Sequence, residues 1–144
     1  MSVVARRYFV RGRQARLTGD AAAAREAFSA AVDLCPTFVE ARIGLGTMLL
    51  RDDPPRAIQV LRGGLGHAPR GRRRRFLLEA LGEAQILGGD FIGADASLSE
   101  AATLPGAGAD LWLRIARLRA RTHRFGDAFS AFAEAASLRR QPRG

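Results

Sequence analysis

The sequence contains neither lysine nor asparagine, so all 23 of its Lys-plus-Arg positions are arginine. The two missing residues have AT-rich codons, whereas the abundant alanine, arginine, glycine and proline have GC-rich ones. A high-GC bacterial genome explains this bias without any function. Arginine still differs from lysine physically, because its planar guanidinium pairs with carboxylates or phosphates as a fork. Acidic residues number only 14, which leaves a formal net charge of +9.

Cysteine and long apolar runs are also scarce. The single cysteine, Cys35, excludes an internal disulfide framework and a cysteine-based zinc site. No apolar run approaches the ~20 residues that a membrane helix needs, and residues 1–12 resemble neither a secretory signal nor an anchor. We therefore expect a cytoplasmic protein without membrane insertion. A hydrophobic content of 47% over 144 residues fits one folded domain.

Four segments of the chain repeat one pattern. An alanine recurs at intervals of 33, 37 and 34 residues: Ala24, Ala57, Ala94 and Ala128. Four residues after each alanine stands a large apolar residue: Phe28, Leu61, Leu98 and Phe132. Upstream of each alanine stands a small residue: Gly12, Gly46, Gly82 and Ala116.

This spacing has a mechanical reason in pairs of helices. A small residue on a first helix lets a second helix cross it closely, the alanine completes the contact, and the large residue one turn later fills the gap beside it. One helix pair cannot bury its apolar face alone, so stacked pairs are needed to form a continuous core.

Further positions follow the same phase. They include Tyr8 and Pro36 in the first repeat, Leu45 and Pro69 in the second, Leu78, Leu81 and Pro105 in the third, and Trp112 and Ile115 in the fourth. This pattern resembles the tetratricopeptide repeat family over about residues 3–140. The resemblance implies an all-α fold, a right-handed α-solenoid of four helix pairs in one domain over residues 1–144, with repeats at about 5–36, 39–69, 75–105 and 109–140.

Local signals place the helix boundaries. We expect eight helices, at roughly 3–17, 21–34, 38–51, 54–67, 73–88, 91–103, 109–122 and 125–140. Thr37 and Glu40 are spaced as a capping box at the start of the third helix. Asp53 before Pro54 is typical of an N-cap followed by proline at the first helical position.

Residues that could carry catalysis or hold a cofactor have simpler explanations. The glycines of residues 63–66 follow no strand and precede no Gly-Lys-Ser/Thr, so they do not form a phosphate loop. His67 and His123 have no second ligand at helical spacing, and Cys35 has no paired base. We therefore expect no enzyme activity, no metal site and no cofactor.

The run of arginines between the second and third repeats is the sharpest local feature, and it consists of Arg70, Arg72, Arg73, Arg74 and Arg75. Positive charge at a helix N-terminus opposes the helix dipole. A solvated linker is the simpler interpretation; the alternative is a docking patch for nucleic acid or an acidic partner. No aromatic residues alternate with the arginines, which disfavours the reading of bases.

The resemblance implies that the first helix of each repeat lines a concave groove that holds an extended or helical peptide. The groove positions carried over from the family are Arg6, Phe9, Arg13 and Arg16; Glu40, Ile43, Thr47, Leu50 and Arg51; Phe76, Glu79, Glu83 and Ile86; and Asp110, Leu113, Arg117 and Arg121. Basic ends thus flank an acidic middle, a pattern that suits a partner of mixed charge.

The last helix carries an apolar stripe of Phe129, Ala133 and Ala136 close to the end of the sequence. A stripe that no further helix covers is a candidate surface for association with a second copy or a partner protein. The first functional hypothesis is a non-enzymatic scaffold or adaptor that binds a protein or peptide in its groove. Docking through the arginine run is the second hypothesis, and a specialised chaperone for a secreted or assembling substrate is the third.

Overall fold

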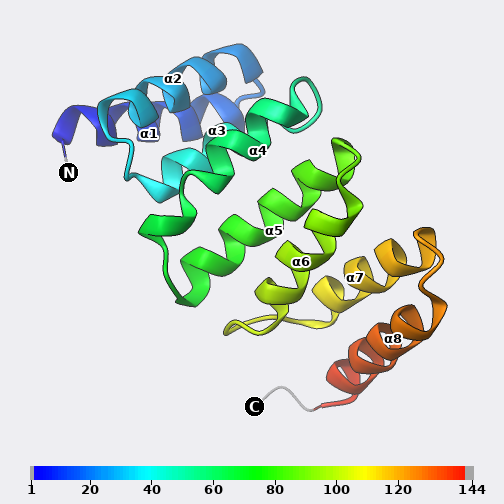
Figure 1. The fold of residues 1–144 in the computed structure, drawn as a ribbon. Helices are drawn as coiled ribbons and strands as arrows, with labels where there is room; N and C mark the ends of the chain where they lie inside the picture. The colour runs from blue at the N-terminus through cyan, green and yellow to red at the C-terminus, as the bar shows by residue number, and fades with distance from the viewer. Residues whose placement is uncertain (1, 142–144) are drawn as a thin grey trace.

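The computed structural model describes residues 2–141, which form eight α-helices and no strand. Figure 1 shows the helices as a stacked array with the first and the last helix at its opposite ends. The all-α prediction is confirmed. The helices are α1 (Val3–Leu17), α2 (Ala21–Leu34), α3 (Val39–Leu49), α4 (Pro54–Arg62), α5 (Gly71–Leu87), α6 (Phe91–Ala102), α7 (Ala109–Arg121) and α8 (Phe125–Arg140), with a short 3-10 helix, η1 (Leu65–His67), after α4.

Each helix packs against the next one along the chain, from α1 through to α8. Helix α3 also contacts both α1 and α5, so the first helices of successive pairs lie along one side of the array. This arrangement is an α-solenoid, and it gives one side to the odd-numbered helices and the other to the even-numbered ones.

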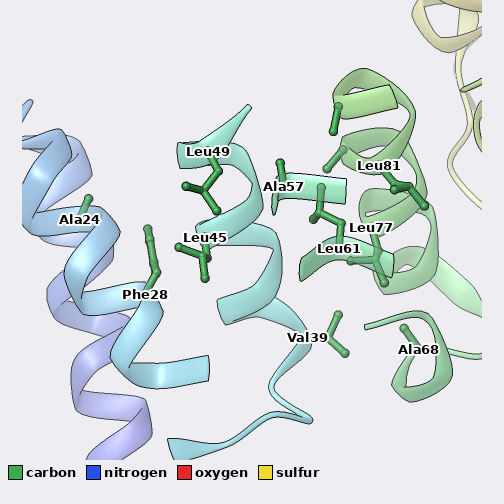
Figure 2. Packing of buried hydrophobic residues seen from close by; sticks show 12 residues of the cluster. Ala24, Phe28, Val39, Leu45, Leu49, Ala57, Leu61, Ala68, Leu77 and Leu81 are labelled. Carbon is green, nitrogen blue, oxygen red and sulfur yellow. The ribbon is translucent and has the colours of Figure 1, made fainter. Parts of the chain in front are cut away.

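Buried apolar side chains form three clusters along the stack. Figure 2 shows the cluster that joins α2, α3, α4 and α5, in which Phe28 and Leu61 are fully buried. A second cluster joins α5 to α8 around Leu98 and Ile115. Burial of each such side chain stabilises the fold by about 1.5–3 kcal/mol. Stability therefore comes from contacts between successive pairs.

Close approach of paired helices explains the glycines of the repeat. A Cβ atom added to Gly46 would lie 2.5 Å from Cδ2 of Leu61, and one added to Gly82 would lie 2.6 Å from Cδ2 of Leu98. The nearest atoms thus belong to the large apolar residue, which presses on the glycine directly. The fourth pair differs, because Phe132 is 42% exposed. The expectation that it fills an inner gap is wrong, since no helix within residues 2–141 follows α8.

Aspartates begin three of the second helices. The side chains of Asp20, Asp53 and Asp90 each accept a hydrogen bond from the backbone N–H three residues later. The capping box predicted at Thr37 is wrong: α3 begins at Val39 with Phe38 as its N-cap and no side-chain cap. Phe38 is buried against α1, and this burial sets where the helix starts.

Helix α4 is shorter than the predicted span of 54–67, because it ends at Arg62 and gives way to η1. The Arg42 side chain explains this end. Its guanidinium donates to the carbonyl oxygens of Pro36 (2.6 Å) and Val60 (3.0 Å). It lies so close to Gly63 that a Cβ there would be 2.6 Å from Nη1. The guanidinium of Arg42, a residue of α3, thus caps the last turn of α4.

Candidate peptide-binding groove

The odd-numbered helices line a hollow of about 420 Å³ on one side of the solenoid. Helices α1, α3 and α5 supply most of its wall, and α7 reaches it through Arg114. The residues that line this hollow are Phe9, Arg13, Arg16, Glu40, Ile43, Gly44, Thr47, Phe76, Glu79, Ala80, Glu83 and Arg114. We call it, together with the hollow beside it described below, the groove.

Aromatic rings give the groove apolar surface at two places. Phe9 packs its ring 5.0 Å from that of Phe38, which fixes it on α1. Phe76 is 41% exposed, with the guanidinium of Arg72 5.4 Å and that of Arg75 4.6 Å from the centre of its ring. Arginine on an aromatic face is an attractive contact. Phe76 is therefore held in place while it remains accessible.

The acidic middle of the groove is neutralised from within. Glu79 accepts a hydrogen bond from Arg75 (3.1 Å) and lies 3.7 Å from Nη1 of Arg114. Nη2 of Arg114 lies 3.8 Å from Glu83, and Arg73 pairs with Glu40 at 2.9 Å. The groove thus offers a partner little negative charge of its own.

Arg114 is the charged groove residue that is absent from the expected positions; the apolar residues Leu87 and Leu118 of the adjoining hollow are absent from them too. Gly44 and Ala80 hold the equivalent places on α3 and α5, two residues before the small residue of each repeat, and both are small. A long arginine at that place on α7 reaches across to the glutamates of α5. The signal in the sequence that could have indicated this role is that Arg114 shares a face of its helix with other arginines.

A second hollow of about 300 Å³ continues the first between α5 and α7, with Glu83 and Arg114 lining both. Its other residues are Ile86, Leu87, Arg117, Leu118 and Arg121. Among residues 2–141, neither Arg117 nor Arg121 pairs with a carboxylate, although Arg121 lies 4.9 Å from the centre of the Phe91 ring. This part of the groove is basic and apolar.

Five expected groove residues lie outside these hollows. Arg6 lines a separate hollow on the far side of α1. Leu50 packs against the core, and Arg51 is exposed in the turn before α4. Asp110 lines another depression with Arg139, while Leu113 is half-buried.

The arginine run does not form one free surface. Arg74 donates to Glu100 (2.5 Å) and to the carbonyl oxygens of Leu65 and Ala68 (both 3.1 Å). Arg75 donates to Glu79 and to the carbonyl oxygen of Pro105 (2.8 Å). The interpretation of the whole run as a solvated linker is therefore wrong for these two residues, which tie loops to α5.

The remaining arginines of the run are more open. Arg70 is the exposed N-cap residue of α5 and makes no side-chain cap, while Arg72 and Arg73 are exposed on its first turn. Arg73 is engaged by Glu40, and Arg72 stacks on Phe76. These contacts connect the run to the rim of the groove.

The outer face of α8 is apolar and open in the described part of the chain. Phe129 is 75% exposed, Ala133 is exposed and Ala136 is half-buried. Phe125 and Phe132 lie on the same helix and are also exposed. An aromatic patch of this kind is unusual on a surface that stays in water.

An ion-pair cluster ties α6 to the last helix pair. Asp95 accepts hydrogen bonds from Arg119 (3.0 Å), Arg124 (2.9 Å) and Ser99 (3.0 Å). Burial raises the pKa of Asp95, but the hydrogen bonds and the two positive charges together lower it by more than burial raises it. The pKa of Asp95 therefore lies below its ordinary value. The cluster lies outside the groove and fastens helices together.

The described residues contain no group of three or more His, Cys, Asp or Glu side chains that could hold a metal ion. Within the same range, no helix combines the length and apolar character needed to cross a membrane.

Comparison with solved structures identifies the fold. The MamA 41-end structure from Desulfovibrio magneticus RS-1 superposes with a TM-score of 0.86 at 18% identity, over 97% of this chain and 78% of that one. Another crystal structure of MamA gives a TM-score of 0.84 at 21% identity, over 96% of this chain and 75% of that one. No protein-family model and no curated protein matches the sequence.

MamA is a TPR-like protein, and the match extends over nearly all of the present chain. At this level of identity the likeness concerns the fold. It agrees with the all-helical array of eight helices described above. The chain therefore has a tetratricopeptide-type α-solenoid fold, as the repeat pattern predicts.

Proposed function

We propose that the protein is a non-enzymatic binding module that holds a peptide or a segment of a partner protein in the groove. The observation that supports this most directly is the pair of adjoining hollows along the odd-numbered helices, with Phe76 held by arginines and left accessible. Concave sites with apolar walls and a few oriented polar groups are typical ligand sites.

The contacts also suggest how such a segment is held. Apolar side chains of the ligand would rest on Phe76 and Ile43. The glutamates of the middle are already paired, whereas Arg13 and Arg16 form no ion pair within residues 2–141 and remain available to carboxylates. Apolar contacts would then supply most of the affinity, and the arginines would set the direction of the peptide. A specialised chaperone would use the same surface.

Docking of nucleic acid through the arginine run has less support, because Arg74 and Arg75 are engaged by the fold. A salt titration separates the two functions. Binding to nucleic acid should weaken steeply as salt rises, whereas binding through apolar groove contacts should change little.

A peptide-display selection against the purified protein tests the proposal, followed by variants of the groove. Phe76→Ala and Ile43→Ala together should weaken the affinity for the selected peptides at least about tenfold, because the loss of an apolar anchor typically costs about 1 kcal/mol or more of binding free energy. Leu17→Ala and Ile92→Ala are the matched controls, because both side chains are exposed outside the groove and outside the apolar face of α8. An equal loss of peptide affinity in the groove variants and the control variants, or a loss in the control variants alone, would contradict the proposal.

Association through the outer face of α8 is a second proposal, favoured by the exposure of Phe129. Light scattering at several concentrations should show a mass that rises with concentration and a monomer for Phe129→Glu. Ile92→Glu, at a residue that is 88% exposed on α6, is the control. A wild-type protein that stays monomeric at high concentration, with no partner that depends on Phe129, would refute it.

A further inference from the structure

The face of α1 that points away from the rest of the solenoid has an unusual composition. Five residues before the small residue of each pair stand Arg7, Ala41, Leu77 and Leu111, and one residue before it stand Arg11, Leu45, Leu81 and Ile115. The six residues of the later helices are all buried among residues of the preceding pair. Arginine replaces them at both places in α1, so this face is not built to receive a further helix pair of the same kind.

These arginines surround a hollow of about 490 Å³, which we call the end hollow. Val3 and Val10 are exposed in it and supply apolar surface between the charges. The lining residues are Ser2, Val3, Arg6, Arg7, Val10, Arg11 and Gln14. A polar end face alone would need no such apolar floor.

Positive charge on α1 is not balanced within the described chain. The helix contains five arginines and no acidic residue, and none of the five pairs with a carboxylate among residues 2–141. Arg7 and Arg11 are one turn apart, where like charges destabilise a helix by a few tenths of a kcal/mol. In later helices, arginines such as Arg74 and Arg119 are instead paired with carboxylates.

We propose that the end hollow binds an acidic amphipathic helix of a partner protein. The stripe from Val3 to Gln14 covers about three helical turns, or roughly 16 Å. A helix of similar length could place two carboxylates one turn apart against Arg7 and Arg11 and an apolar side chain on Val10. A second copy of this chain fits less well, because the Phe129, Ala133 and Ala136 face of α8 would bury the two arginines without carboxylates.

Fluorescence anisotropy with a labelled helical peptide of Glu, Leu and Ala, with one acidic and apolar face, tests this surface. Arg7→Gln/Arg11→Gln should weaken the apparent Kd about tenfold, as expected for two exposed ion pairs, and Val10→Ser should weaken it about threefold. Arg56→Gln/Arg62→Gln is the matched control, since it removes the same charge from exposed positions on α4 that line neither the end hollow nor the groove. That variant should change the Kd less than twofold.

Each other result overturns the proposal. Absence of saturable binding at low salt would show that the arginines only make the end polar. Equal losses in the two arginine variants, or equal binding of a peptide with the same residues in scrambled order, would show a diffuse charge effect. Tighter binding of a labelled DNA duplex, lost in the same Arg7/Arg11 variant, would assign the surface to nucleic acid. Circular dichroism of each variant establishes that the helices are intact.

Discussion

The substitution Gly46→Ala tests the packing that sets the spacing of the repeat. Alanine in a helix interior is ordinarily favoured over glycine by about 1 kcal/mol. At Gly46, however, the new Cβ would lie 2.5 Å from both Cδ2 and Cγ of Leu61, and Leu61 is fully buried. Because Cγ cannot rotate away as a terminal methyl can, α4 itself must move away from α3.

Overpacking of this kind costs about 1–3 kcal/mol. After the gain in helix propensity is subtracted, Gly46→Ala should destabilise the protein by about 1 kcal/mol. Gly126→Ala is the matched control: it lies in α8 with nothing within 4 Å of its new Cβ, so it should stabilise by up to about 1 kcal/mol.

Thermal melts followed by circular dichroism measure both variants. The two midpoints should lie on opposite sides of the wild-type value, up to about 8 °C apart at roughly 4 °C per kcal/mol for a chain of this size. If Gly46→Ala raises the midpoint as much as Gly126→Ala does, the account of the small residue in each repeat is refuted.

Three further predictions concern other parts of the fold. His123 has a φ of 63° in the turn after α7, where Gly19 and Gly89 stand in two other turns, so His123→Gly should raise the unfolding free energy by about 0.5–1 kcal/mol in urea melts. Arg74→Ala should lower it by about 1–3 kcal/mol, because the part-buried carbonyl oxygens of Leu65 and Ala68 lose their donor, whereas Arg72→Ala should change it by less than about 0.5 kcal/mol. The pKa of Asp95 is lowered in the folded protein, so this carboxylate stabilises the fold fully above its pKa in the unfolded chain, which is about 4. The stabilisation is lost as pH falls through the pKa of the folded state. Asp95→Asn should therefore lower the midpoint of thermal unfolding at pH 7 and reduce the fall in stability below about pH 4.

The helices could be predicted wherever their signals are local. Asp53 and Pro54 mark the start of α4 within two residues of sequence, and the structure has this cap. Thr37 has equally good local spacing, yet α3 starts later because Phe38 is drawn into the contact with Phe9 of α1. Tertiary burial overrides the cap there, and sequence spacing alone does not record it.

The partners of the long arginine side chains were the feature that could be predicted least well from the sequence. Arg74 and Arg75 read as part of a charge run, but their partners Glu100 and Pro105 lie 26 and 30 residues away. Arg42 shapes the end of α4 from a distance of 18 residues. Such pairings depend on how the repeats stack, so the spacing of residues along the sequence does not predict them.

Site-specific photo-cross-linking to a display-selected peptide tests most directly whether the groove is the binding surface. A benzophenone amino acid placed at Thr47 in the groove should cross-link to the peptide, and one placed at Glu26 or Ile92, exposed on α2 and α6, should not. Cross-links from Glu26 or Ile92 with none from Thr47 would contradict the account.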